Sequence, residues 1–432
     1  MDWKTEWKPF ALIIATFLAC FYLPTGTPRF DNAVMESLRL VKWYAREHVL
    51  LCLIPAFFIA GAISVFVSRV SVMKYLGSRA NRVLAYSVAS VSGTVLAVCS
   101  CTVLPLFGGI YKMGAGLGPA ITFLYSGPAI NVLAIILSAR ILGLDIGIAR
   151  AVGAISFSLI IGLLMHVIFR SEEIDKANAQ MLLPESEAKR PLWQTTLYFL
   201  SMFAILVFAN WGKPDTAGGF FYFIFTIKWY LTGIAAIGLG VILCLWFTVP
   251  WFTMLSISVP TALLAFLFPH EPLISFGTGI FGISIIAARD QKELGEWFVA
   301  TWSFTKQITP LLLAGVLVAG ILLGRPGNEG IIPRVWITGL VGGNSLWTNF
   351  FASVVGAFMY FATLTEVPIV QGLLGSGMGK GPALALLLAG PALSLPNMLV
   401  LNKIMGTKKT VVYCTLVVIM ATFSGILFGT FY

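Results

Sequence analysis

Residues 93–135 form an apolar stretch that glycine and proline interrupt at short intervals. Proline removes a backbone hydrogen-bond donor and clashes with the preceding turn, and glycine weakens a helix. Inside a bilayer, each backbone group freed in this way must be satisfied by protein or by water in a cavity. The stretch therefore predicts two broken or re-entrant membrane segments that line a site.

The same spacing of glycine and proline residues recurs once, further along the chain. Gly93 aligns with Gly356, an offset of 263 residues (356 − 93 = 263), and no gap is needed. The expected helix-breaking positions are Pro105, Gly109, Gly127 and Pro128, which align with Pro368, Gly372, Gly390 and Pro391. Paired interruptions in two halves predict the binding site of a transporter. The alternative is a structural repeat whose small residues only let helices pack closely.

The composition indicates what kind of protein contains such a stretch. Of the 432 residues, 58% are hydrophobic and 11% are charged, whereas charged residues make up about 25% of a soluble protein. We therefore expect an all-α polytopic membrane protein with two internal repeats. About 10–13 membrane segments, each of roughly 20 residues, fit this length. The expected location is the cell inner or plasma membrane, crossed several times.

Charge, cysteine content and motifs limit the partners and the chemistry. The net charge of +10 is typical of basic loops beside anionic lipid, so the expected partners are the bilayer and a small-molecule substrate, not nucleic acid. The sequence leaves a homo-oligomer open. The six cysteines lie in apolar segments, which argues against a disulfide framework. Because no P-loop or zinc-protease motif is present, we expect no cofactor, no metal site, no catalytic residue and no enzyme activity.

Changes in composition divide the chain into four regions. Residues 1–170 are expected to hold the first repeat with an N-terminal helix, 171–191 a polar linker, 192–272 intervening membrane helices, and 273–432 the second repeat. Residues 30–48 are amphipathic and suit the membrane interface. The basic loops 69–82 and 403–409 are the best cytoplasmic candidates. If each broken pair returns to its starting face, this favours parallel repeats, with inverted repeats as the alternative.

Glu366 is a carboxylate within an apolar segment. Insertion scales put the cost of a charge at the centre of a membrane helix at about 2.5–3.5 kcal/mol, and such residues usually face a cavity or pathway. The functional interpretation is a proton-coupling or substrate site. The structural interpretation is an acceptor for backbone donors freed near Pro368.

Cys99 and Cys101 are two residues apart in the first broken stretch. On a regular helix their thiols would point in different directions, so they could bind one soft centre only where the backbone is irregular. Thiolates suit thiophilic ions. Two buried apolar cysteines are the equal alternative.

Neutral polar residues also lie in the broken segments and could coordinate a hydroxylated solute. They could equally cap broken helix ends. The predicted set is Ser100, Thr102, Asn131, Thr365, Gln371, Ser394 and Asn397.

These two stretches resemble the ArsP-type predicted permease family. The resemblance is carried by the Cys-x-Cys element at Cys99 and Cys101 and by Pro105, Gly127-Pro128, Asn131, Glu366 and Gly390-Pro391. Members of that family are associated with efflux of trivalent organoarsenicals. The resemblance thus implies a secondary transporter that exports such a compound, or a similar thiophilic molecule, by ion-coupled alternating access.

Two other functions fit the residues. One is a permease for a different small solute or anion, because helix N-termini aimed at a site favour negative charge. The other is a membrane thiol-redox protein that uses Cys99 and Cys101.

Overall fold

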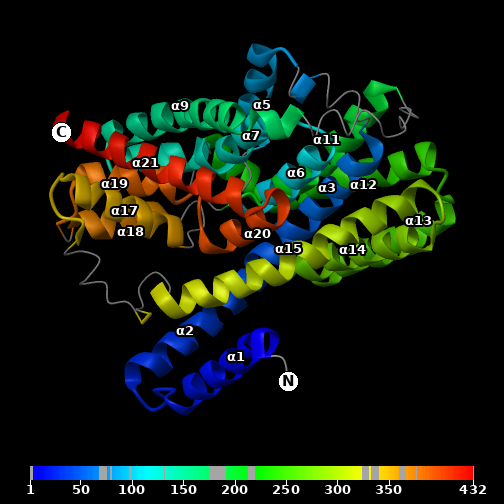
Figure 1. Cartoon of the computed structure of the whole chain (residues 1–432). Coiled ribbons are helices and arrows are strands. Elements are labelled where there is room, and N and C mark those ends of the chain that lie inside the picture. Colours follow the sequence, from blue (N-terminus) through cyan, green and yellow to red (C-terminus); the bar gives the residue numbers. More distant parts are fainter. Residues whose placement is uncertain are drawn as a thin grey trace.

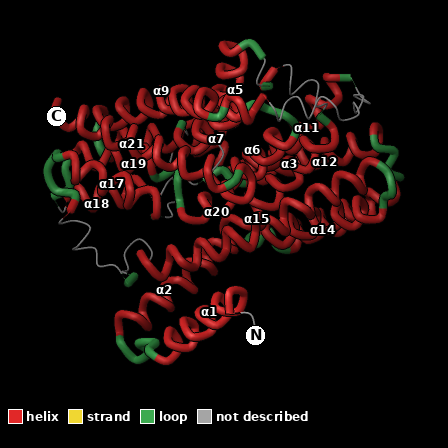
Figure 2. The backbone as a smooth tube through the Cα atoms, in the orientation of Figure 1, coloured by secondary structure: helices red, strands yellow, loops and turns green. Residues whose placement is uncertain are grey.

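The computed structural model describes residues 3–67, 75–77, 80–96, 100–130, 132–174, 191–212, 219–323, 330–331, 340–359, 366–375 and 377–431. Within these residues the regular elements are helices, and the β-structure is one isolated bridge between Gly342 and Met378 (Figures 1 and 2). Six of the helices are long and apolar enough to cross a membrane. The expected all-α polytopic membrane fold is confirmed.

The amphipathic segment near the N-terminus is part of a long membrane helix. After α1 (Trp3–Phe21), the chain continues without a break through α2 (Pro28–Tyr44), the π-helical η1 (Ala45–Leu53) and α3 (Ile54–Phe66). One side of the amphipathic segment 30–48 packs against protein, and its position at the membrane interface stays a prediction. Ser37 donates a hydrogen bond to the Leu317 carbonyl oxygen at 3.0 Å, within α15 (Glu293–Leu323).

The broken segments form two sets of five helices. The first set is α5 (Arg82–Leu96), α6 (Ser100–Lys112), α7 (Leu117–Ala129), α8 (Val132–Ile141) and α9 (Leu144–Ile168). The second is α17 (Leu346–Phe358), α18 (Glu366–Gly375), α19 (Lys380–Ala389), α20 (Leu395–Met405) and α21 (Thr407–Phe431). The helix limits follow the sequence offset: α9 starts at 144 and ends at 168, and α21 starts at 407 and ends at 431 (407 − 144 = 431 − 168 = 263). We call α2 to α9 the first half and α15 to α21 the second half.

Matching helices in the two halves run in opposite directions. Just beyond the end of α9, Glu173 pairs with Lys409 at the start of α21, at 2.7 Å. At the other end of α9, Asp145 pairs with Lys380 at the start of α19, at 3.8 Å. The α9 and α21 helices are therefore antiparallel, as their opposed course in Figure 1 shows. The parallel arrangement favoured by the basic loops is wrong for these helices.

The reason is that only one helix pair in each set returns to its starting face. Tyr86, near the start of α5, donates to the Gly162 carbonyl oxygen at 3.3 Å, and Tyr111, at the end of α6, donates to Glu173 at 3.0 Å. Both ends of the α5–α6 pair thus lie beside the end of α9. The α7–α8 pair begins at this same face, where the Leu117 amide donates to Glu173 at 3.1 Å. It ends beside the start of α9, on the opposite face.

Four further helices flank this assembly: α11 (Leu192–Ala209), α12 (Gly219–Trp246), α13 (Trp251–Leu267) and α14 (Pro272–Arg289). They lie at the right of Figure 1, with α13 at the edge. No residue of α13 is buried, and the side chain of Phe266 is 84% exposed. An apolar helix with this exposure suits contact with lipid, so the polar chemistry is concentrated between the two halves.

Candidate functional site

A buried ion pair joins the two halves. Arg150, in α9, and Glu366, the first residue of α18, are each 0% exposed, and Nη2 of Arg150 pairs with Oε1 of Glu366. Nη1 of Arg150 donates to the Ser138 hydroxyl group of α8 at 2.8 Å. Removing two charges from water is costly. The attraction between Arg150 and Glu366 offsets this cost only while the two groups stay in contact.

The pair leaves hydrogen-bonding capacity unused. Nε of Arg150 and Oε2 of Glu366 are buried and have no hydrogen-bond partner among the described residues. The same is true of the Tyr413 hydroxyl group and of Oδ1 of Asn397. Each unsatisfied buried polar atom costs about 1–3 kcal/mol of stability. Several of them in one region therefore indicate a binding role for that region.

Sequence reasoning selected Glu366 but missed its partner. Arg150 follows Arg140 and Asp145 closely in the sequence, as in a polar loop, whereas α9 begins at Leu144 and encloses Arg150. Gly143, with a φ of 109°, is the residue that turns the chain into α9. Glu366 itself could have pointed to Arg150. A charge inside the membrane is usually paired, so a buried carboxylate predicts a basic partner in another helix.

The two halves also meet through a tyrosine beside the ion pair. The Tyr125 hydroxyl group, in α7, donates to the carbonyl oxygen of Leu388, in α19, at 2.8 Å. Tyr125 lies within electrostatic reach of Arg150, and Tyr413 in α21 lies within reach of Tyr125. Helices α7, α9, α18, α19 and α21 therefore converge on one buried region.

Glycine contacts bring the helices of each half together. A Cβ atom added at Gly162 in α9 would lie 2.8 Å from the carbonyl oxygen of Gly118 in α7. One added at Gly425 in α21 would lie 2.7 Å from the carbonyl oxygen of Gly381 in α19. The two contacts occupy matching positions (381 − 118 = 425 − 162 = 263). Small residues thus set the spacing between each broken element and the long helix behind it.

The other predicted polar residues do not form one cluster. Thr102 is buried beside Cys52, with 2.7 Å between the hydroxyl oxygen and the sulfur. Ser394 accepts a hydrogen bond from the Asn397 amide at 3.4 Å and caps α20, which is the capping role considered for it. The side chain of Gln371 is exposed, because it lies on the outer side of α18, so the structure does not place it in the buried region.

Several predicted residues fall outside what the structure describes. Cys99, Asn131 and Thr365 lie outside the described residues, as do the side chains of Ser100, Cys101 and Pro368. The Cys-x-Cys interpretation therefore stays a prediction.

The predicted breaks lie at different places in the helices. The breaks predicted at Pro105 and Gly109 are wrong, because α6 continues through both residues. Pro368 and Gly372 likewise lie within α18. Proline is tolerated inside membrane helices where neighbouring groups satisfy the freed backbone, and in the first turn of a helix it costs little. The pairs Gly127-Pro128 and Gly390-Pro391 lie at the ends of α7 and α19. The interruptions thus fall between α7 and α8 and between α19 and α20.

An apolar cavity of about 410 Å³ lies elsewhere, between the first half and α11. Its walls come from α3, α5, α6, α7 and α11 and include Ile63, Val88, Leu106, Phe123 and Phe203. None of the predicted polar residues lines it. We place the chemistry at the ion pair, because an apolar wall offers no group that could bind a proton or an ion.

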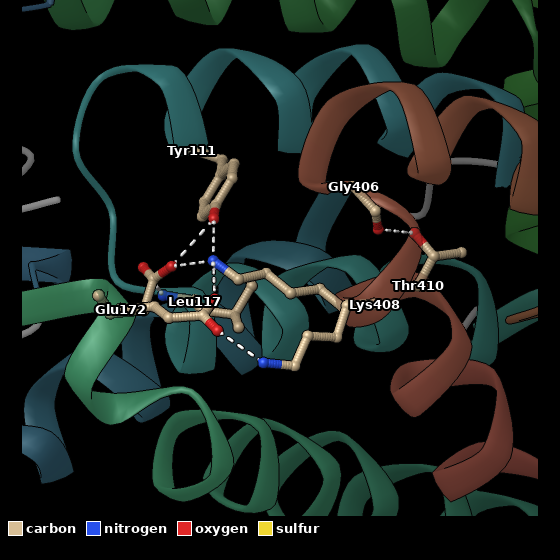
Figure 3. A network of polar contacts seen from close by, with 8 residues as sticks. Tyr111, Leu117, Glu172, Gly406, Lys408 and Thr410 are labelled. Atoms are coloured by element: carbon tan, nitrogen blue, oxygen red, sulfur yellow. Dashed lines mark hydrogen bonds and ion pairs between the residues drawn. The ribbon is translucent and has the colours of Figure 1, made fainter.

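A second polar network closes one face of the molecule. Figure 3 shows the Tyr111 hydroxyl group and the Leu117 amide converging with lysines of α21 on the carboxylates that follow α9. Glu173 accepts hydrogen bonds from both and from Lys409 at 2.7 Å. Lys408 donates to Glu172 at 2.9 Å, and this bond lowers the pKa of the Glu172 carboxyl group. The network joins the first half to the second across this face.

Comparison with known proteins identifies the family. The family model described as "predicted permease" matches residues 35–430. The UPF0718 protein MJ0584 of Methanocaldococcus jannaschii is 40% identical over 403 residues, which cover 92% of this chain and 96% of that protein. The UPF0718 protein YraQ of Escherichia coli is 34% identical over 117 residues, 26% of this chain and 30% of YraQ. No solved structure matches. With its helical membrane fold and a family match over nearly its full length, the chain belongs to the ArsP_1 predicted permease family.

Proposed function

We propose that this permease is a secondary transporter that exports trivalent organoarsenicals, or a similar thiophilic small molecule, by ion-coupled alternating access. The proposal combines the family with the arsenical efflux that the family resemblance implies, a resemblance carried in part by Cys99, Cys101 and Glu366. It places the protein in the cell inner or plasma membrane. The face that carries Lys112, Arg170, Lys408 and Lys409 is the cytoplasmic one, because basic residues are retained on that side.

The observation that carries the proposal is the ion pair between Arg150 and Glu366. It joins a continuous helix of one half to the first residue of a short helix in the other, and both side chains are fully buried. Charged groups at such a position mark ion and substrate pathways. A contact between halves that protonation of one carboxylate weakens would couple alternating access to a proton.

In the proposed cycle Glu366 is the proton-coupling residue. While Glu366 is ionised, Arg150 holds α18 against α9. Proton uptake removes the negative charge and weakens this contact, so the halves can move relative to each other. The network of Glu173 and Lys409 acts as the cytoplasmic gate, because it must open before a solute passes between α7 and α21.

Cys99 and Cys101 hold the substrate in this proposal, and the neutral polar residues assist them. A trivalent arsenical is soft and mostly neutral in its hydroxylated form, so thiol groups bind it reversibly. Asn397 is buried in the described part of the second broken element, and its Oδ1 atom has no hydrogen-bond partner there. In the proposal it accepts a hydrogen bond from a substrate hydroxyl group.

The test is uptake into everted membrane vesicles, with a trivalent organoarsenical and a panel of other solutes, with and without a pH gradient. We expect gradient-dependent arsenical uptake by the wild-type protein and its loss in Glu366→Gln and in the double variant Cys99→Ser/Cys101→Ser. Arg289→Gln is the matched control, because Arg289 is exposed at the end of the peripheral helix α14. If no arsenical is taken up while another solute is, the substrate assignment is wrong.

A further inference from the structure

Arg150 has a property that Glu366 lacks: its charge is permanent. The guanidinium group stays protonated in proteins, so the positive charge in this region persists whatever the protonation state of Glu366. Among the described residues, Arg150 in α9 is the charged group that faces Glu366. The titratable neighbours are Tyr125 in α7, close to Arg150, and Tyr413 in α21, close to Tyr125. Ser138 of α8 is neutral.

Protonation of Glu366 therefore creates an imbalance. The region would then hold a buried, unpaired cation, which is strongly unfavourable, because breaking a buried pair leaves the other charge uncompensated. The described residues offer no second carboxylate to Arg150: the remaining contact is the Ser138 hydroxyl group, and Nε has no partner. Since none of the described residues supplies a compensating negative charge, we assign this role to an anion from solution.

We propose that Arg150 is a binding site for a small monoanion with a carboxylate or similar oxyanion group, which replaces the Glu366 carboxylate when Glu366 takes up a proton. This inference rests on the proposed function and adds that a monoanion binds together with the proton. The balance is simple: the ionised Glu366 gains one proton, and the released Arg150 gains one anion. The net charge of the site stays zero in both states.

The geometry favours an oxyanion over a spherical anion. The occupant of the site is now a carboxylate, and a guanidinium group presents N–H donors in a planar fork that matches carboxylate oxygens. Nε of Arg150 and the Tyr413 hydroxyl group are buried donors without a partner. Glu366 thus acts as an internal substitute for the ligand, and Oε2 of its carboxylate also lacks a partner in this state.

The experiment measures anion binding to the purified full-length protein by thermal unfolding. Benzoate and methanesulfonate are the probes, since both stay ionised between about pH 5.5 and about pH 8, and benzamide and dimethyl sulfone are neutral controls. In the wild-type protein we expect the apparent Kd of the anions to rise about tenfold per pH unit wherever Glu366 is ionised, because only the protonated fraction is competent. Chloride should bind more weakly than either oxyanion.

Variants separate the two residues. The Glu366→Gln variant should bind both anions with an affinity that does not change between about pH 5.5 and about pH 8. The double variant Arg150→Gln/Glu366→Gln should bind neither anion. Arg289→Gln should behave as the wild type. Absence of anion binding to the wild type at low pH overturns the proposal, and so does unchanged binding in the double variant. The wild-type pH series decides the question even if Glu366→Gln does not fold.

The failure of this proposal can be distinguished from failure of the proposed function. Arsenical export that continues unchanged when oxyanions are removed, without anion binding at Arg150, would leave the transporter assignment intact and refute the anion site. The opposite result is also possible to recognise. If the protein transports no arsenical but loses anion binding when Arg150 is replaced, the anion site stands and the arsenical assignment fails.

Discussion

The hydroxyl group of Tyr125 donates a hydrogen bond to the carbonyl oxygen of Leu388 at 2.8 Å, and these two residues occupy matching positions in the two halves (388 − 125 = 263). A contact between matching positions lies close to the axis that relates the halves. The bond satisfies a buried carbonyl group of α19 close to the interruption at Pro391. It therefore links the two broken elements, α7 and α19, directly.

Replacing Tyr125 by phenylalanine should destabilise the protein by about 1–3 kcal/mol, because the Leu388 carbonyl group would be left buried without a donor. Thermal unfolding in detergent measures the change. Tyr22→Phe is the matched control, since Tyr22 is 74% exposed and should be neutral. Equal stability of the two variants would show that the bond between the halves contributes nothing.

The glycine contact of the second half predicts a large effect of a single methyl group. Gly425→Ala should destabilise the protein by about 1–3 kcal/mol through overpacking, because the Cβ atom would meet the Gly381 carbonyl oxygen at 2.7 Å. Gly233→Ala is the control: Gly233 also lies in a membrane helix, and nothing lies within 4 Å of its added Cβ atom. The difference in unfolding temperature between these variants is the measurement. A smaller loss at Gly425 than at Gly233 would contradict the close contact between α19 and α21.

The ion pair predicts non-additive effects. Arg150→Gln alone and Glu366→Gln alone should each cost about 3–5 kcal/mol, because each leaves a buried uncompensated charge. The double variant should be more stable than either single variant. A double-mutant cycle of unfolding free energies gives the coupling, and additive losses would mean that the two side chains do not pair.

Two neighbouring lysines of α21 should behave differently. The side chain of Lys409 is 12% exposed and bonds to Glu173, whereas that of Lys408 is 76% exposed. Lys409→Gln should therefore lower the unfolding temperature and loosen the cytoplasmic gate, while Lys408→Gln should have little effect, because exposed pairs contribute little. Thermal unfolding of both variants in detergent measures the difference. Equal unfolding temperatures would argue against a gate held by Lys409.

The pH dependence of the exposed pair follows from the lowered pKa of Glu172. A depressed folded-state pKa stabilises the protein above the unfolded pKa, and this contribution is lost as the pH falls through the folded value. The effect of Lys408→Gln, small as it is, should thus vanish in acid rather than in base. Comparing unfolding of the two proteins over a pH series tests the sign.

The membrane class was predictable from the composition, and the interruptions at Gly127-Pro128 and Gly390-Pro391 were predictable from the glycine–proline spacing, whereas α6 continues through Pro105. The limits of α9 and α21 even repeat the sequence offset. The direction of the halves was not predictable, because it depends on which helix pair returns to its starting face. That is decided by distant contacts such as Leu117 with Glu173.

The ion pair was half predictable for a similar reason. Glu366 is conspicuous in an apolar segment, but Arg150 follows Arg140 and Asp145 closely and so looks like part of a polar loop. Only the turn at Gly143 shows that the helix begins before Arg150. The exposure of Gln371 likewise depends on which side of α18 faces α8 and α19, which no local pattern specifies.

The opposed course of α9 and α21 has a consequence for how the molecule could switch. If each half can adopt the shape that the other now has, an exchange of shapes turns an entrance on one side of the bilayer into an entrance on the other. A substitution in one half and its counterpart in the other should then push the equilibrium in opposite senses, so that one traps the protein facing the cytoplasm and the other traps it facing outward.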